Sequence, residues 1–350
     1  MKARPQRRHG RRRPLRALSR LVAALLLPWI ALEIGARLVG YHAPDNRARV
    51  LLFPKFPAFY QPDRDLAWKF RPNLDWTGRD FVQPFSTDGA GWRTTPGGGD
   101  GDTAVDCIGN SSTFGYGSRD RNTYPAVLAQ LLGAPVRNLG VPGYTSLSAR
   151  LVAEQLRHPA PVSVVMTGFN DHFPSYRTAR EELWIRRAAY TCFASRVCAF
   201  LFDHLARPRA DTRPPLVEFT PAVFPEEYRE NLVATVRSLR AAGSEPILLV
   251  YPPLLADEGT RAAVAAHWKH PRALVYANID AHPTYQEITR EVGRSEHVEV
   301  VDLARVFATR GNEALHIDWV HPNDAGYRLI ARTLLGPVRR ALARSRPEAG

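Results

Sequence analysis

Three side chains, Ser111, Asp318 and His321, have the types that nucleophilic attack by a hydroxyl requires. A serine hydroxyl is a weak nucleophile until an imidazole removes its proton, and a carboxylate must orient that imidazole. Asp318 and His321 lie three positions apart, so one loop can present the imidazole toward Ser111 while the carboxylate accepts its other ring N–H. We therefore expect Ser111 as nucleophile, His321 as general base and Asp318 as orienting group.

Gly143 and Asn170 are candidate donors to the negative charge that develops on a carbonyl oxygen during such an attack. Glycine lets the backbone approach a ligand closely and offers an N–H, while the asparagine side chain offers an NH₂ group. The N–H of Ser111, at the start of a predicted helix, is a third donor. Each also has a purely structural explanation, because Ser111 fits a helix cap, Pro142-Gly143 a type II turn and Asn170 a helix start.

Two other chemistries are weighed against this interpretation. His316, Asp318 and His321 form the pattern H-x-D-x-x-H, which could bind a metal ion, but zinc sites need further ligands and no second cluster follows. The Gly-x-Ser-x-Gly turn of α/β-hydrolases is absent, since Thr113 replaces the second glycine. The serine interpretation is therefore favoured, with no metal or organic cofactor expected.

Short apolar runs alternate with helical patterns from residue 104 onward. The predicted strands are 104–109, 136–140, 162–168, 246–251 and 298–303, and the clearest predicted helices are 225–242 and 324–343. Most of the strands are continuous apolar runs, as in parallel strands covered on both faces. This alternation predicts an α/β fold, a three-layer α/β/α sandwich with a five-stranded parallel sheet of flavodoxin-like type. Ligands bind at the carboxyl ends of such strands, where the loops carrying the candidate residues would meet.

The amino terminus predicts a membrane anchor. The chain of 350 residues has a net charge of +13, and nine basic residues without an acid fall within residues 1–20. Without that tail the charge is 13 − 9 = +4, so nucleic acid is not an expected partner. The apolar stretch 21–40 has about the length of a spanning helix. A basic cytoplasmic tail (1–20) before a transmembrane anchor (21–40) would place the rest of the chain outside the cytoplasm. A cleaved signal peptide and a buried soluble helix are the alternatives.

The remaining chain divides into a loop-rich leading segment (41–103) and a catalytic domain (104–345) with an insertion (172–224). Cys192 and Cys198 could form a disulfide in an oxidising periplasm if the segment between them is a loop, whereas in a helix they would point to different faces. Cys107, within an apolar run, is expected to be a small buried core residue.

Taken together, four blocks of the sequence resemble the SGNH (GDSL-type) hydrolase superfamily. GNSSTFGYG is similar to its first block, with Ser111 at the nucleophile, and NLGVPGYT to its second, with Gly143 at the oxyanion glycine. GFND matches the third block, with Asn170 at the oxyanion asparagine, and DWVHPNDAGYRLIA the last, with Asp318 and His321 as its Asp-x-x-His. The leading segment, with DLAWKFRPN and TDGAGWR, looks like that of membrane-anchored bacterial members.

The resemblance implies a serine-dependent ester hydrolase that acts on an ester-bearing substrate outside the cytoplasm, for example by O-deacetylating a carbohydrate. An acyltransferase with the same triad and an inactive protein that binds or assembles polysaccharide are the alternatives. The chain departs from the family pattern at Asn110, where the family usually has Asp beside the nucleophile. Asparagine has nearly the same shape but lacks the charge and can donate a hydrogen bond.

Overall fold

The computed structural model describes residues 12–40, 59–77, 83–193, 195–205, 218–268 and 271–345. The chain divides into two compact units, which we describe separately. The larger unit comprises Pro57–Arg187 and Thr212–Gly350, and the smaller comprises Met1–Phe56 and Ala188–Asp211.

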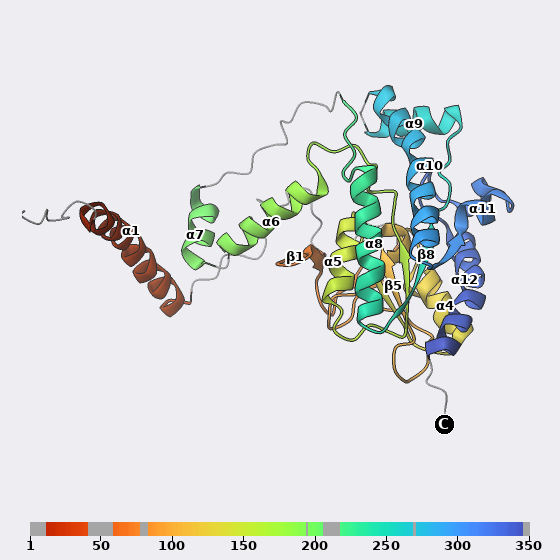
Figure 1. The fold of residues 1–350 in the computed structure, drawn as a ribbon, viewed down its shortest axis with the longest axis horizontal. Helices are drawn as coiled ribbons and strands as arrows, with labels where there is room; N and C mark the ends of the chain where they lie inside the picture. The colour runs from red at the N-terminus through yellow and green to blue at the C-terminus, as the bar shows by residue number, and fades with distance from the viewer. Residues whose placement is uncertain are drawn as a thin grey trace, which may run out of the picture. The chain divides into compact units, whose positions relative to one another are not determined.

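A five-stranded parallel sheet lies at the centre of the larger unit (Figure 1), with the strand order β6-β5-β7-β8-β9. The strands are β5 (Val105–Gly109), β6 (Val136–Gly140), β7 (Val162–Met166), β8 (Glu245–Val250) and β9 (Glu299–Asp302). Val105 pairs with Val136 on one side and with Val162 on the other, so the first strand lies inside the sheet. The predicted α/β fold with a five-stranded parallel sheet is confirmed.

Helices cover both faces of this sheet. The helices of this unit include α3 (Ser111–Phe114), α4 (Tyr124–Leu132), α5 (Ser146–Gln155), α8 (Pro225–Ala241), α9 (Glu258–Trp268), α10 (Arg272–Ser295), α11 (Leu303–Ala308) and α12 (Asp324–Ser345). Helix α8 packs on α5 and α10, whereas α4 packs on α12. Figure 1 shows the strands between these two groups of helices, which gives three layers. The side chain of Asn323 accepts from the N–H groups of Ala325 and Gly326, so it caps α12.

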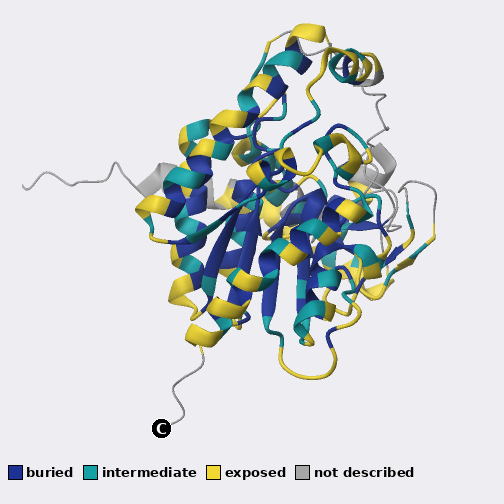
Figure 2. Cartoon of the chain, turned by 90° about the vertical axis from the view of Figure 1, so that its right-hand side faces the viewer, coloured by how far each residue is buried: buried dark blue, intermediate teal, exposed yellow. Residues whose placement is uncertain are grey.

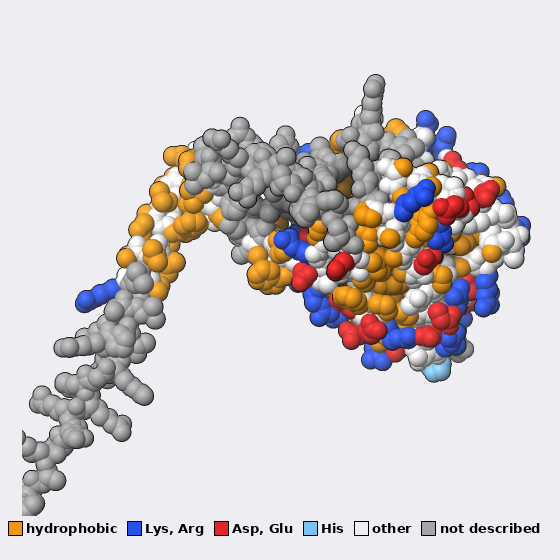
Figure 3. Space-filling model, turned by 90° about the horizontal axis from the view of Figure 1, so that it is seen from above, with side chains coloured by type: hydrophobic (Ala, Val, Ile, Leu, Met, Phe, Trp, Pro, Cys, Tyr) orange, Lys and Arg blue, Asp and Glu red, His pale blue; other side chains and the backbone are white. Residues whose placement is uncertain are grey.

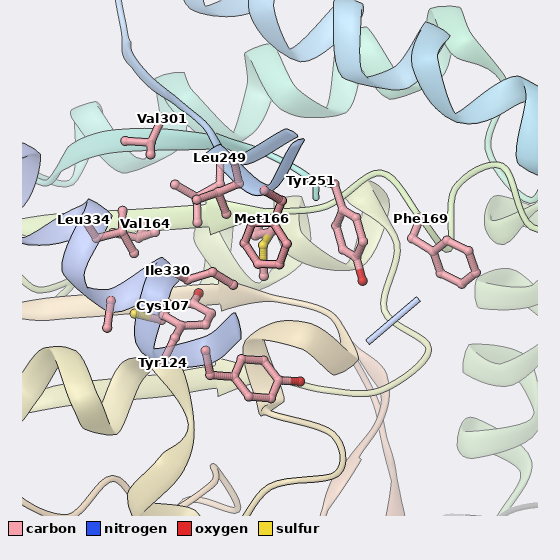
Figure 4. Close-up of a cluster of buried hydrophobic side chains, with 14 of the residues drawn as sticks. Cys107, Tyr124, Val164, Met166, Phe169, Leu249, Tyr251, Val301, Ile330 and Leu334 are labelled. Carbon is pink, nitrogen blue, oxygen red and sulfur yellow. The ribbon is translucent and has the colours of Figure 1, made fainter. Parts of the chain in front are cut away.

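The hydrophobic core lies between the sheet and these helices. Strand residues are dark blue in Figure 2, whereas the outer faces of the helices are exposed. Val164 and Leu249, from adjacent strands, belong to the same buried cluster as Ile330 and Leu334 of α12 (Figure 4). Cys107 of β5 is fully buried, as the sequence predicted, and forms no disulfide.

The leading segment forms two small antiparallel sheets that pack on α3, the helix that begins at Ser111. Strands β1 (Tyr60–Asp63) and β2 (Ala67–Phe70) form one, and β3 (Asp75–Trp76) and β4 (Phe85–Ser86) form the other. The rings of Phe70 and Phe85 lie 5.0 and 5.1 Å from the ring of Phe114, measured between centroids. A buried aromatic cluster therefore joins the leading segment to α3, and its members are Phe59, Phe70, Phe85 and Phe114.

The smaller unit contains α1 (Arg12–Leu38) and α7 (Arg196–Leu205), and α6 (Ala179–Phe193) runs from the larger unit into it. Glu33 of α1 accepts hydrogen bonds from Val197 N–H and Ser195 Oγ and pairs with Arg37. The Val197 N–H and these other donors lower the pKa of Glu33 to about 2. Cys198 is disulfide-bonded, and the side chain of Cys192 lies outside the described residues.

The expected transmembrane anchor over 21–40 is not supported. Helix α1 forms there with hydrophobic side chains such as Leu25 and Leu27 exposed (Figure 3). However, among the residues that the structure describes, no helix combines the length and the apolarity that crossing a bilayer requires. Glu33 lies within the expected span, and the hydrogen bond from Val197 N–H of α7 favours its ionised form, a charge that would be costly inside a bilayer.

Candidate active site

Ser111 begins α3 directly after the carboxyl end of β5. Its neighbour Asn110 is the helix cap, with its side-chain oxygen accepting from Ser112 N–H at 3.0 Å. Gly109 must be glycine, because a Cβ there would lie 2.2 Å from Thr113 Oγ1 and 2.4 Å from Met166 O. The strand can therefore turn sharply into the helix, which leaves the Ser111 side chain at the sheet edge and 6% of the residue exposed.

The structure brings Ser111, His321 and Asp318 together in one chain of hydrogen bonds. The Nε2 atom of His321 lies 2.9 Å from Ser111 Oγ, and its Nδ1 lies 2.8 Å from Asp318 Oδ2. The other oxygen of Asp318 accepts from the N–H groups of Val320 and His321. Burial opposes ionisation of Asp318, but the hydrogen bonds from His321 and the backbone prevail and lower its pKa. A carboxylate held in this way fixes the tautomer with the proton on Nδ1, leaving Nε2 free to accept from the serine.

An aromatic ring covers the imidazole. The ring of Tyr116 lies against that of His321 in a tilted arrangement, with 4.3 Å between ring centroids and 34° between ring planes. Its backbone oxygen accepts from the buried hydroxyl of Tyr327 at 3.0 Å, which fixes the loop after α3. Tyr116 lies five residues after Ser111, and no feature of the sequence indicates that its ring contacts His321.

Gly143 and Asn170, the other predicted site residues, line one cavity. Gly143 has a φ of +85°, and the adjacent Tyr144 carbonyl accepts from Asn170 Nδ2 at 2.8 Å. Val141 N–H donates to Gly109 O at 3.1 Å, which joins the loop after β6 to the end of the nucleophile strand. These bonds bring the loops after β5, β6 and β7 to one edge of the sheet, as the sequence predicted. The last loop differs, because α11 and a short 3₁₀ helix (Asn312–Leu315) lie between β9 and Asp318.

Asp171 fixes the loop that carries Asn170, a role that the sequence did not indicate. Its carboxylate is fully buried and accepts from Ser146 N–H at 2.7 Å and Gly168 N–H at 3.0 Å. Burial raises the pKa of Asp171 from the ordinary 3.8 to about 6, despite these hydrogen bonds. Because the folded state binds this proton more tightly than the unfolded chain, the stability that protonation contributes is lost as the pH rises through about 6.

Arg93 of the leading segment fixes the C-terminal end of α3 through hydrogen bonds. Its guanidinium donates to the carbonyls of Phe114 and Gly115 at 2.9 Å and to that of Ser118 at 2.6 Å. It also pairs with Asp120 at 2.8 Å and lies over the ring of Phe114. Only 2% of Arg93 is exposed, and burial lowers its pKa. In the sequence, Arg93 is the last residue of TDGAGWR, and no pattern there indicates its role.

Asn110 keeps the capping function of the usual aspartate without its charge. Its oxygen accepts from Ser112, whereas its buried Nδ2 has no hydrogen-bond partner among the described residues. An aspartate would place a second acceptor at that position instead of a donor. The departure therefore leaves the start of the nucleophile helix intact and changes the polarity of one buried atom.

The alternative metal site is not assembled by the part of the chain that the structure describes. No group of three His, Cys, Asp or Glu side chains there is placed to hold a metal ion. The Nδ1 atom of His316 lies 2.8 Å from Asn312 O, and its ring packs on Phe307 rather than joining Asp318 and His321.

Comparison with known proteins agrees with the resemblance seen in the sequence. Residues 107–329 match the model of the GDSL-like Lipase/Acylhydrolase family. This match covers more than half of the chain, so the protein belongs to this family and is a carboxylic ester hydrolase. The search of curated proteins finds no match.

Two solved structures are similar to this chain at low sequence identity. A lipase/acylhydrolase from Enterococcus faecalis is 19% identical with a TM-score of 0.43, and the match covers 71% of this chain and 100% of that one. An acetylxylan esterase from Geobacillus stearothermophilus, solved as a catalytic mutant, is 19% identical with a TM-score of 0.41, covering 69% of this chain and 95% of that one.

Proposed function

We propose that the protein hydrolyses carboxylic esters through an acyl-serine intermediate on Ser111. The observation that supports this is the unbroken chain of hydrogen bonds from Asp318 through His321 to Ser111. His321 Nε2 takes the hydroxyl proton as Ser111 Oγ attacks the carbonyl carbon, and Asp318 stabilises the resulting imidazolium. Collapse of the tetrahedral intermediate breaks the ester C–O bond, and His321 returns the proton to the leaving alcohol. Water then attacks the acyl-serine by the same steps and releases the acid.

The charge on the tetrahedral oxygen would be stabilised by the N–H groups of Ser111 and Gly143 and the side-chain amide of Asn170. Gly143 and Asn170 border the same cavity, and the loop of Asn170 is fixed by Asp171. Fixed donors stabilise such a charge without reorganisation, and each typically contributes about 3 kcal/mol to lowering the barrier.

The test is turnover of p-nitrophenyl acetate by the full chain and by two serine variants. Ser111→Ala should lose nearly all activity and its labelling by a fluorophosphonate probe. Ser112→Ala is the matched control, because Ser112 lies in the same helix but its hydroxyl bonds to Tyr251, so the probe should still label Ser111. Equal rates for the wild type and Ser111→Ala would refute the nucleophile assignment. A wild type that neither turns over esters nor reacts with the probe would favour an inactive binding protein.

We further propose that the catalytic unit works outside the cytoplasm. Cys198 is disulfide-bonded, and disulfides persist mainly in oxidising compartments. The basic residues 1–20 followed by the apolar stretch of α1 are also typical of export. Fusions of alkaline phosphatase and of a cytoplasmic reporter to the carboxyl terminus test this location. An active cytoplasmic reporter with inactive phosphatase would contradict it.

The substrate class that the family resemblance suggests is an acylated carbohydrate, with O-acetyl as its simplest acyl group. We propose such an ester as the substrate, to be tested by titrating the acid released from acylated oligosaccharides. Hydrolysis of p-nitrophenyl esters without any release of acid from acylated oligosaccharides would contradict this part of the proposal.

A further inference from the structure

The ring of Tyr116 lies over one face of the catalytic imidazole. The centroids of the Tyr116 and His321 rings are 4.3 Å apart, and the ring planes enclose an angle of 34°. Two rings placed edge to edge cannot approach so closely, because their outer atoms would collide. The imidazole therefore lies over a face of the phenol ring. The side chain of His321 is 17% exposed, and the Tyr116 ring is one of the groups that cover it.

The position of this ring is set by contacts with both loops that carry the triad. The Tyr116 N–H donates to Ser111 O at 2.9 Å, and Tyr116 O accepts from the hydroxyl of Tyr327 at 3.0 Å. The next residue, Gly117, packs so closely on Ile317 that a Cβ there would lie 2.1 Å from Ile317 Cδ1. Ile317 belongs to the loop of the catalytic aspartate. The ring is therefore fixed relative to the nucleophile and to the base.

The reaction changes the charge of the ring that Tyr116 covers. His321 is neutral before the attack and becomes an imidazolium when it takes the proton of Ser111. The face of an aromatic ring attracts a cation that lies within about 6 Å of its centroid. The contact is therefore stronger in the charged state than in the neutral state, and only such a difference lowers the barrier.

Two further observations favour an effect of this ring face. The side chain of Asp318, the other partner of the imidazolium, is 38% exposed, so water screens part of its charge. Burial, and after it the charge of Asp318, raise the pKa of Tyr116. The phenol therefore keeps its proton while His321 works, and the attraction comes from the face of a neutral ring.

We propose that Tyr116 is a positioning residue that acts through His321, with its ring face stabilising the imidazolium formed during acylation and deacylation. The inference rests on the proposed function and adds a residue to it. Removal of the aromatic face in Tyr116→Leu should lower kcat/KM about three- to thirtyfold. Tyr116→Phe keeps the face and should stay within about twofold of the wild type.

The test is a series of full-length proteins with phenylalanine or its mono-, di- and trifluoro analogues at position 116. Each fluorine withdraws electron density from the ring face with little change in volume. With p-nitrophenyl acetate as substrate, kcat/KM on the pH plateau should fall stepwise along the series. The acid limb of the pH profile should move to lower pH in the same order, because the imidazolium of the free enzyme loses the same attraction. A ring that only filled space would give neither trend.

Other titratable groups near the imidazole are the same in every member of this series. Asp318 accepts from His321 Nδ1, and its pKa is lowered by its hydrogen bonds despite burial. His316 also interacts electrostatically with His321, and burial lowers the pKa of His316. Since neither residue is changed, differences between the fluorinated proteins report the ring face alone.

The same fluorinated series at Tyr276 is the matched control. The guanidinium of Arg261 lies 5.2 Å from the centroid of the Tyr276 ring, so this ring also faces a cation. The two residues belong to α10 and α9, which carry none of the triad residues. Fluorination there should leave both kcat/KM and the acid limb as in Tyr276→Phe.

A flat series at position 116, in an enzyme that still depends on Ser111, would overturn the inference and leave the proposed function standing. A Tyr116→Phe protein as slow as Tyr116→Leu would also overturn it, because the hydroxyl rather than the ring face would then matter. Urea midpoints show which variants fold, and the fluorinated rings keep the test open if leucine is not tolerated. Absence of ester turnover by the wild type would instead overturn the proposed function, and this inference with it.

Discussion

Replacing Arg93 by methionine tests whether the leading segment fixes the nucleophile helix. Methionine retains much of the aliphatic volume but removes every donor. The carbonyl of Ser118 would lose the guanidinium as its partner, whereas Gly115 O keeps the Ser118 N–H and Phe114 O keeps Asn138 Nδ2. The free energy of unfolding should therefore fall by about 1–3 kcal/mol for the Ser118 carbonyl, which is left without a hydrogen bond. It should fall by smaller amounts for the carbonyls of Phe114 and Gly115, which keep one partner each.

Two further contributions raise this estimate. The contact of the Arg93 guanidinium with the Phe114 ring adds about 1–2 kcal/mol, because both groups are desolvated. The ion pair with Asp120 adds less, because that carboxylate is 22% exposed and still accepts from the Ser86 N–H and hydroxyl. The total is about 3–5 kcal/mol, in line with the loss of one partner from a buried charged network.

Urea denaturation measures this change. A loss of about 3 kcal/mol lowers the midpoint by roughly 1–3 M for ordinary m-values. Arg93→Lys should lose less, because it keeps the charge but cannot reproduce the planar fork of donors. Arg71→Met is the matched control, since Arg71 lies exposed in the same segment, and it should change stability by less than about 0.5 kcal/mol. An Arg93→Met protein with the wild-type midpoint and wild-type kcat/KM would refute the reasoning.

Two further predictions concern Asp318 and Asp171. Asp318→Asn should lower kcat by about 10⁴-fold while the fold is retained. The amide nitrogen would face Nδ1 of His321 and stabilise the tautomer whose Nε2 carries the proton, so Nε2 could no longer accept from Ser111. A loss of ester turnover below about tenfold would contradict this. Asp171→Asn removes a carboxylate whose pKa is raised to about 6, so the stability of the wild type relative to the variant should fall by about 1 kcal/mol from pH 5 to pH 7. Urea midpoints at the two pH values measure it, and a difference that rises with pH would show that the carboxylate is not held as the structure indicates.

The sequence was most informative where local chemistry and periodicity agree. The strand 136–140 was placed as the structure has it, because a continuous apolar run between turn signals has few other solutions. Ser111, Asp318 and His321 could be found because their side-chain types limit their chemistry. The three-residue spacing also indicated the hydrogen bond between Asp318 and His321. The path of the chain through α11 and the 3₁₀ helix could not be predicted, because it depends on packing against the rest of the fold.

Other features depend on contacts between distant segments. Arg93 reads in the sequence as one arginine among many, and only packing against Phe114 shows that it is buried. Asp171 resembles an ordinary helix start until the folded chain removes it from water. The expected anchor over 21–40 was inferred from length and apolarity, whereas the hydrogen bonds that hold Glu33 come from residues more than 160 positions later.

The contacts of Arg93 and Trp68 have a practical consequence for dissecting this enzyme. Both residues precede the first strand of the parallel sheet. Arg93 nevertheless hydrogen-bonds the end of α3, and Trp68 forms part of the wall of the cavity beside Gly143 and Asn170. A fragment that contained only the parallel sheet and its helices would lack Phe70 and Trp68. It would expose Phe114 and leave the cavity open on one side. Deletion or domain-swap experiments should therefore keep the whole stretch from Pro57 with the sheet, since the cavity would otherwise lose one of its walls.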